Sequence, residues 1–299
     1  MSSWPTRARK ALSRRFLVLF TRTISFCARM IPYRLAVAAG GQLGFFAYYL
    51  LSRERNRAIA HLSSVFPERG AAWARQVAHR TFSHLGKSLL EAMAINPGRL
   101  RSDITFRGFE HLEDALGQGK GLVFVTGHIG NWEIMAAAVA AKYPVSVVAA
   151  PIEPEPVNDM IVRLRASRGV RTILRSRAGA AKELIRVFRE NRILGILIDQ
   201  DTDVDGAFVD FMGRPAWTPT AAAQMAIKFG APVMFGYVQR GCDNRHTITI
   251  EGPLNLIRTG NDKEDISTNT AMFTKKIENV ILRNPAQWVW MHRRWRRQP

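Results

Sequence analysis

From residue 104 onward, short apolar runs of strand length alternate with longer stretches of helical length. The strand-like runs lie at 104–106, 122–125, 145–149, 193–198 and 232–238, with a further strand at 170–174. The helical stretches lie at 109–117, 132–142, 155–168 and 178–190. Such alternation is typical of an α/β fold. We therefore expect a mixed, mostly parallel sheet flanked by helices, with ligands bound outside the carboxyl ends of its strands.

The N-terminal third has a different pattern. Residues 11–51 are largely apolar, and Leu35 to Ser52 is uncharged over eighteen residues. That is the lower limit for a membrane-spanning helix, and three glycines and a glutamine interrupt the run. An amphipathic anchor lying in the membrane interface is favoured over a true span. A buried core helix is the third alternative.

Residues 53–93 continue with helical spacing of apolar positions, broken at Phe66-Pro67-Glu68. Asn96-Pro97-Gly98 then ends the helical part. We therefore divide the chain into an N-terminal helical membrane-anchoring region, residues 1–95, and an α/β domain, residues 96–299.

Candidate chemistry lies where the apolar run at 122–125 meets the next helix. Gly127 and Gly130 allow a sharp turn, and Asn131 is a good N-cap for a helix from Trp132. His128 then lies in the turn and Glu133 in the first helical turn. A carboxylate that reaches back to one imidazole nitrogen leaves the other free to take a proton, so the pair can act as a base. The alternative is a core histidine that merely satisfies a partner. The N–H groups at the helix start could also hold an oxyanion.

The stretch 193–212 raises the question of a metal. Asp201-x-Asp203-x-Asp205-Gly206 resembles the start of a calcium loop, but the twelfth position, which needs a bidentate Glu, is Met212. We therefore expect no metal site. Asp199 and Gln200 end a predicted strand, so this stretch is either a solvated loop or a polar rim near the His128 turn. Further along, Thr218-Pro219 predicts a helix start with proline in the first position, and Gly230 its end.

The charge is unusual: 43 Lys and Arg against 24 Asp and Glu, a net of +19. Such an excess attracts polyanions, namely nucleic acid, anionic lipid or an acidic carrier protein. Tryptophans among the C-terminal arginines suit base stacking or a membrane interface. No nucleic-acid-binding motif accompanies them, so the membrane is favoured. Cys27 and Cys242 provide no disulfide framework and lack metal-ligand spacing. The N-terminal basic residues, which precede any acidic one, are Arg7, Arg9, Lys10, Arg14, Arg15 and Arg22.

Four segments in order resemble the lipid A biosynthesis (lauroyl/myristoyl) acyltransferase family, within the lysophospholipid and glycerolipid acyltransferases. The first is Gly127-His128-Ile129-Gly130-Asn131-Trp132-Glu133, which is similar to the family's motif of a histidine, four residues and an acid. The others are Leu197 to Asp201 with Phe208 to Ala216, Ala231-Pro232-Val233, and Trp288 to Arg294. The resemblance covers most of the chain, and Glu133 in place of Asp fits the lipid A branch.

The resemblance implies acyl transfer from an acyl carrier protein thioester, or acyl-CoA, to a hydroxyl of a lipid or glycolipid such as a lipid A precursor. The reaction implied takes place at the cytoplasmic face of a bacterial inner membrane and needs no metal or further cofactor. His128 would deprotonate the acceptor, and Glu133 would orient His128. Arg177 resembles a family arginine of the site, and Arg175 is close enough to take its place. Substrate binding is expected of Asn131, Arg177, Asp199 and Gln200.

Alternatives remain at this point. Some members of this branch act on ornithine lipids, mannosylated lipids or pigments, so the acceptor does not follow from the resemblance. A catalytically inactive lipid- or carrier-binding protein on the same scaffold is the main alternative. A basic nucleic-acid-binding protein is the third and least favoured hypothesis, so we expect no nucleic-acid partner.

Overall fold

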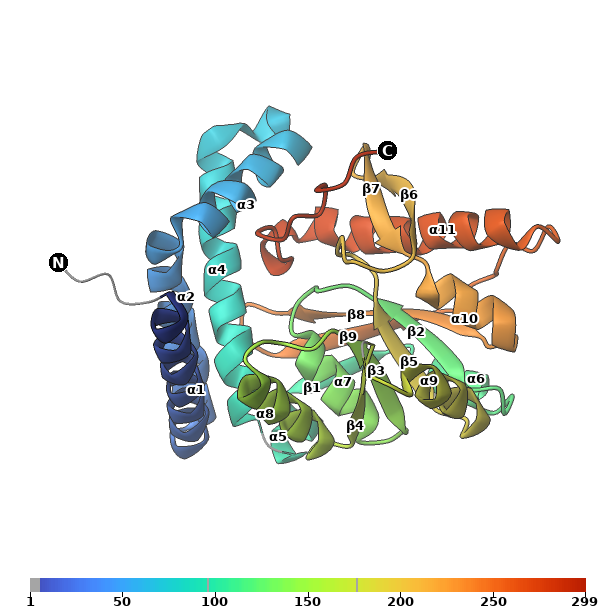
Figure 1. Ribbon diagram of the computed structural model, residues 1–299, viewed down its shortest axis with the longest axis horizontal. Helices are drawn as coiled ribbons and strands as arrows, with labels where there is room; N and C mark the ends of the chain where they lie inside the picture. The colour runs from blue at the N-terminus through green and yellow to red at the C-terminus, as the bar shows by residue number, and fades with distance from the viewer. Residues whose placement is uncertain (1–5, 96, 176) are drawn as a thin grey trace.

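The computed structural model describes residues 6–95, 97–175 and 177–299. Its centre is a seven-stranded sheet of order β1-β9-β8-β2-β5-β3-β4, in which only the β8–β9 pair is antiparallel (Figure 1). The strands are β1 (Ile104–Arg107), β2 (Leu122–Thr126), β3 (Val145–Ala149), β4 (Val170–Leu174), β5 (Ile193–Leu197), β8 (Val233–Arg240) and β9 (His246–Glu251). The expected α/β fold with a mixed, mostly parallel sheet is confirmed.

Both faces of the sheet are covered, which explains why the strands are nearly continuous apolar runs. All five residues of β2 are buried. Val123 and Val125 belong to a core shared with α10 and α11, whereas Leu122 and Phe124 belong to a core shared with α6 and α7. The helices of the α/β part are α5 (Pro97–Ser102), α6 (Glu110–Leu116), α7 (Trp132–Ala140), α8 (Glu155–Ala166), α9 (Ala180–Arg189), α10 (Ala221–Phe229), α11 (Asp262–Arg283) and the 3-10 turn η2 (Pro285–Gln287).

The N-terminal part is a helical layer beside one edge of the α/β part (Figure 1). It consists of α1 (Thr6–Met30), α2 (Tyr33–Leu50), α3 (Ser52–Val65), the 3-10 turn η1 (Pro67–Arg69) and α4 (Gly70–Ala94). The break predicted at Phe66-Pro67-Glu68 is confirmed, since α3 ends at Val65 and η1 follows. The boundary proposed at residue 95 stays a prediction.

Glycines in α2 have a packing role. Helices α2 and α4 cross so closely that a Cβ on Gly40 would lie 2.4 Å from the Gly86 carbonyl oxygen, and one on Gly44 would lie 2.1 Å from that of Phe82. Backbones approach this closely only where side chains are absent. Within the described residues, no single helix is long and apolar enough to cross a membrane. Helices α2 and α3 meet that test only together, and they are bent by 91°. The spanning and interfacial alternatives therefore both stay predictions.

Many apolar side chains of α1 and α2 nevertheless face outward. The most exposed are Leu19, Phe26, Met30, Leu35, Phe46, Tyr49 and Leu50, between 57% and 80% accessible. The side chains of Arg14, Arg15 and Arg22 are exposed beside them, whereas Arg7, Arg9 and Lys10 lie outside the residues whose side chains are described. The helical layer thus presents apolar and basic groups together.

Three strands are absent from the sequence prediction. β9 completes the antiparallel pair with β8, and β6 (Gly206–Phe211) and β7 (Arg214–Pro219) form a separate hairpin over α11 (Figure 1). Pro219 ends β7 opposite Gly206, so its expected place inside the next helix is wrong; α10 begins at Ala221. Gly230 ends α10 in the left-handed region, as expected.

The C-terminal tryptophans do not form an interface. Trp288, Trp290 and Trp295 are at most 7% exposed. Arg294 is fully buried, and its guanidinium donates to the Trp217 carbonyl oxygen and the Thr218 hydroxyl. This segment locks the β6–β7 hairpin in place, so the expected use of these tryptophans for stacking or membrane contact is wrong.

Candidate active site

The sheet register brings His128 and Asp199 together. β2 and β5 are adjacent and parallel, with Thr126 opposite Leu197. Each chain then runs two residues beyond its strand, to His128 and to Asp199. The two side chains therefore meet at the carboxyl edge of the sheet, where α/β proteins bind their ligands.

Asp199 holds His128 at two points. The Asp199 carboxylate accepts a hydrogen bond from the His128 backbone N–H through Oδ2 at 2.8 Å, and its Oδ1 lies 2.8 Å from the imidazole Nδ1. The Asp199 side chain is fully buried, whereas that of His128 is 22% exposed. Burial by itself raises the pKa of Asp199, but the charge of His128 and the hydrogen bonds to the carboxylate outweigh it and lower this pKa to about 2. An ionised Asp199 requires a proton on Nδ1, which leaves Nε2 as the basic nitrogen.

The C-terminal segment completes this arrangement. Trp288 donates its indole N–H to Asp199 Oδ2 at 2.7 Å. Trp288 also forms an antiparallel bridge with Ile129, and the Gly130 N–H donates to the Gln287 carbonyl oxygen at 2.8 Å. The C-terminal segment therefore helps to hold the turn that carries His128. Sequence reasoning missed the contact with Trp288, because nothing in the local pattern relates positions so far apart.

Glu133 lies elsewhere than expected. Its two carboxylate oxygens accept from Arg165 of α8, at 2.6 Å and 2.9 Å. Burial lowers the pKa of the Arg165 guanidinium, but the hydrogen bonds and charge of Glu133 raise it overall, so the guanidinium stays charged. Two other contacts therefore replace the expected one between Glu133 and His128. The imidazole Nδ1 binds Asp199, and the Glu133 carboxylate binds Arg165. Arg165 is a further site residue that the sequence reasoning missed.

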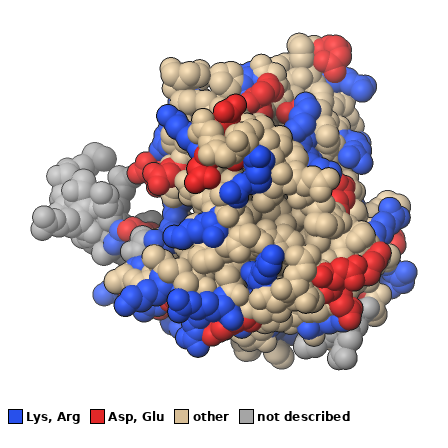
Figure 2. All heavy atoms as spheres, turned by 90° about the vertical axis from the view of Figure 1, so that its right-hand side faces the viewer, with Lys and Arg blue, Asp and Glu red and all other residues tan. Residues whose placement is uncertain are grey.

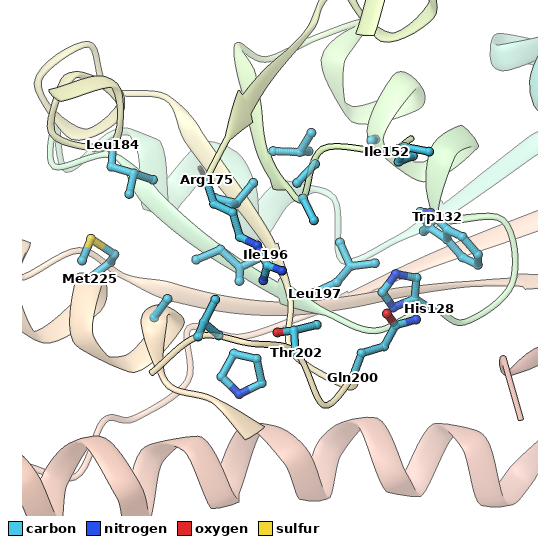
Figure 3. A pocket seen from close by; sticks show the side chains of 18 of the residues that line it. His128, Trp132, Ile152, Arg175, Leu184, Ile196, Leu197, Gln200, Thr202 and Met225 are labelled. Atoms are coloured by element: carbon cyan, nitrogen blue, oxygen red, sulfur yellow. The ribbon is translucent and has the colours of Figure 1, made fainter. Parts of the chain in front are cut away.

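A cavity of about 490 Å³ opens beside His128. Trp132 lines it near His128, and Leu184 and Met225 line its far end (Figure 3). Glu133 and Arg165 belong to its lining as well. Between them, Val147, Ile196 and Leu197 of the sheet form an apolar wall. The Trp132 ring stands edge-on to the imidazole, with centroids 4.8 Å apart. The cavity is mostly apolar, with polar side chains such as Arg175, Gln200 and Gln224 among the apolar ones, which suits a ligand with a hydrocarbon chain.

The remaining predicted site residues divide into two groups. Gln200 lies beside His128 in the cavity, and Arg175 extends into it from the end of β4 (Figure 3). Arg177 is exposed and is not among the described residues that line the cavity, so Arg175 takes the place expected of it. Asn131 is 2% exposed, and its amide donates to α4 rather than into the cavity. Asp199 lies behind His128, so neither Asn131 nor Asp199 is placed to touch a substrate.

The aspartate-rich loop after β5 has protein partners. Asp201 accepts from Arg296 at 3.1 Å and from the Arg297 backbone N–H at 3.0 Å, and Asp203 accepts from Arg297 at 2.8 Å. Across the described ranges, no group of three or more His, Cys, Asp or Glu side chains could hold a metal ion. The expectation that the protein needs no cofactor stays a prediction.

Comparison with known proteins decides the family. The family model described as bacterial lipid A biosynthesis acyltransferase matches residues 7–297. The chain belongs to this acyltransferase family. The resemblance stated from the four sequence segments is thereby confirmed.

Curated relatives of this lipid A acyltransferase family member fall in two groups. It is 24% identical to the lipid A biosynthesis lauroyltransferase of Escherichia coli (strain K12), over 90% of this chain and 88% of that protein. It is 22% identical to a lipid A biosynthesis acyltransferase of Haemophilus influenzae, over 87% of this chain and 81% of that protein. It is also 29% identical to the phosphatidylinositol mannoside acyltransferase of Mycolicibacterium smegmatis, where the match covers about half of each protein, 46% of both.

Proposed function

We propose that this protein is an O-acyltransferase that moves a fatty acyl chain from a carrier thioester to a hydroxyl of a lipid or glycolipid. One observation carries the proposal: His128, held at Nδ1 by the buried Asp199, borders a mostly apolar cavity. A base with a fixed tautomer is what deprotonation of a hydroxyl requires. Membership of the acyltransferase family supports the same reaction.

The proposed reaction is a direct transfer. His128 Nε2 takes the proton of the acceptor hydroxyl while its oxygen attacks the thioester carbonyl carbon. The tetrahedral intermediate then expels the thiolate, which takes the proton back from the imidazolium. The C–O bond formed balances the C–S bond broken, and no acyl-enzyme is needed. Asp199 stabilises the imidazolium in the manner of the third member of a triad. General base catalysis of this kind contributes about 10²- to 10⁴-fold.

Glu133 receives a different role in this proposal from the one expected at first. Because Arg165 donates to both of its oxygens, Glu133 fixes the Arg165 guanidinium in the wall of the cavity that His128 also lines. A fixed guanidinium is well suited to a phosphate of the acceptor or to the oxyanion of the intermediate. Glu133 therefore acts through Arg165.

The cavity supports an acyl donor with a long chain. Its apolar wall extends away from His128 toward Leu184 and Met225, so the thioester carbon would lie at His128 and the methyl end among these side chains. Arg175 and Gln200 provide polar contacts for the donor or the acceptor. An acyl carrier protein or CoA is proposed as the thiol carrier, and basic side chains, which intersperse with acidic ones on the face in Figure 2, would favour either anionic carrier.

The acceptor and the place of reaction are also proposals. A lipid A precursor is favoured because relatives aligned over most of the chain are named for lipid A biosynthesis. An inositol mannoside lipid is the second candidate, since a shorter match carries that name. We propose the cytoplasmic face of the bacterial inner membrane, since exposed apolar side chains of α1 and α2 lie beside basic ones.

A transfer assay tests the function. Purified protein in membranes is given radiolabelled acyl carrier protein thioesters or acyl-CoA, with a lipid A precursor, an inositol mannoside lipid or a total bacterial lipid extract. We expect the wild type to produce one labelled lipid class, and mass analysis to give acceptor and chain length. Folded, membrane-bound wild type that binds donor but labels no lipid would overturn the proposal in favour of a binding protein.

Variants in the same assay assign the roles. His128→Ala and Asp199→Asn should lower kcat by about 10²- to 10⁴-fold. Glu133→Gln should also lower the rate, but Arg165→Gln in that background should add little, because the two residues act as one pair. Asp265→Asn is the matched control, since Asp265 is a buried carboxylate of α11 that binds Thr259 away from the cavity. If Asp199→Asn keeps wild-type kcat, the assignment of Asp199 is wrong.

A further inference from the structure

A second buried carboxylate lies beneath the His128 turn, outside the site described above. Glu91 of α4 is fully buried and accepts five hydrogen bonds from four residues. Its Oε1 accepts from the Tyr33 hydroxyl, from Arg240 Nη1 at 3.0 Å and from His246 Nε2 at 2.9 Å. Its Oε2 accepts from Arg240 Nη2 and from the Asn131 amide at 2.8 Å. Four elements of structure therefore converge on one carboxylate.

Asn131 connects this cluster to the catalytic turn. Its amide nitrogen donates to Glu91 and, at 3.1 Å, to the Ser88 carbonyl oxygen of α4. Its amide oxygen accepts from the Ile134 N–H at 3.4 Å and so caps α7. Asn131 lies three residues after His128 and two before Glu133. The side chain that begins α7 is thus fixed in space by α4.

Stability alone does not explain such a cluster. A buried ion pair often contributes no more than apolar residues of the same volume, because both charges must leave water. Burial raises the pKa of Glu91, but hydrogen bonds from His246 and Arg240 lower it overall to about 2, so the carboxylate is charged. The charged carboxylate instead orients its neighbours, because its two acceptor oxygens fix the positions of the side chains that donate to them.

We infer that Glu91 is a positioning residue for acyl transfer, which acts through Asn131 to fix the turn that carries His128. Asp199 and Gln287 hold this turn from the sheet and from the C-terminal segment. Glu91 holds its other end, where α7 begins. A displacement of about 1 Å at a reacting group can cost about 10²-fold in rate, so loss of this contact should affect turnover. The inference rests on the proposed function, since turnover means acyl transfer.

The test is a double-mutant cycle on kcat. Glu91→Gln keeps the shape of the side chain but turns one acceptor into a donor. Asn131→Ser keeps a helix cap but loses the amide donor. Each variant should lower kcat by about tenfold to a hundredfold with KM changed less than about threefold, and the double variant should be no slower than the worse single variant. Glu91→Asp, which keeps the charge but shortens its reach, serves if Glu91→Gln does not fold.

Asp265→Asn is again the control: it disturbs a buried carboxylate of another part of the molecule, so its melting temperature should fall while kcat stays unchanged. Two results would overturn the inference: Glu91 variants that lose only melting temperature, and effects of Glu91→Gln and Asn131→Ser on kcat that simply multiply. Failure of the proposed function is distinguishable, because the wild type itself would then transfer no acyl group.

Discussion

At the scale of single residues, the groups around His128 come from distant parts of the chain. Asp199 lies 71 positions after it, and Trp288 lies a further 89 positions on. His84 of α4 packs beneath the same turn, where its Nε2 lies 3.4 Å from the Ser88 hydroxyl. Burial, and then the charge of Arg240, lower the pKa of His84 to about 3. This histidine is therefore neutral in the folded protein at pH values where an unfolded chain would protonate it.

His84 predicts acid sensitivity. Below the unfolded pKa of about 6.5, His84 binds a proton in the unfolded state but not in the folded state. The free energy of unfolding therefore decreases as the pH is lowered from about 6.5 to about 3. The contribution approaches about 1.4 kcal/mol per pH unit. His84→Gln should therefore show a smaller loss of unfolding free energy between pH 6.5 and 5 than the wild type, as measured by chemical denaturation.

The depressed pKa values of Glu91 and Asp199 do not affect this window, because those carboxylates gain protons only below about pH 4.5. Above about pH 8, the imidazole of His84 is neutral in both states, so wild type and variant should show the same slope there. Equal slopes between pH 6.5 and 5 would contradict the prediction.

At the scale of elements, helices α2 and α4 are in very close contact. Three glycines make it: Gly40 and Gly44 on α2, and Gly86 on α4. A Cβ on Gly86 would lie 2.1 Å from the Gly40 carbonyl oxygen and 2.7 Å from the Gly44 nitrogen. Helix α4 also carries Glu91, which binds the Asn131 amide. The contact with α2 therefore supports the helix that positions Asn131.

Gly86→Val should consequently separate the two helices. Overpacking of this kind costs about 1–3 kcal/mol, and more where backbone atoms obstruct the new side chain. We expect a lower melting temperature in thermal unfolding followed by circular dichroism. Gly117→Ala is the control, because a Cβ there meets nothing closer than 3.4 Å and its φ of −57° suits alanine. A Gly86→Val protein as stable as the control would show that the fold does not depend on this close contact between α2 and α4.

At the scale of the whole molecule, the helical layer carries the apolar surface. Phe46 and Leu50 of α2 are 59% and 80% exposed, beside exposed apolar residues of α1. Large exposed apolar patches with basic neighbours mark sites of interaction with membranes or proteins. The α/β part, in contrast, buries its cores on both faces of the sheet.

A vesicle-binding measurement tests this surface. The double variant Phe46→Ser, Leu50→Ser should bind phosphatidylglycerol vesicles at least about tenfold more weakly in flotation assays, because each buried side chain contributes about 1.5–3 kcal/mol. High salt should weaken vesicle binding by the wild type, because it screens the attraction between basic side chains and anionic lipid. Leu282→Ser, at an exposed position of α11, is the control and should bind as the wild type does. Unchanged binding by the double variant would exclude this surface as the membrane contact.

Local patterns were sufficient for much of the fold. The β2 run, the Gly127–Gly130 turn and the Asn131 cap are defined within a few residues, and each was predicted where the structure has it. β9 and the β6–β7 hairpin were missed, because their stability depends on pairing with strands already in place.

By itself, the sequence determined that a histidine lies in the turn between β2 and α7, because apolar periodicity, glycine and capping act over a few residues. Only the tertiary structure decided which carboxylate meets which cation. Strand order placed Asp199 at His128, and the packing of α8 against the sheet placed Arg165 at Glu133. The carboxylates of Asp199 and Glu133 are both chemically able to accept a hydrogen bond from a histidine. The choice depends on long-range geometry, since a hydrogen bond forms only over about 3 Å, whatever the separation in sequence.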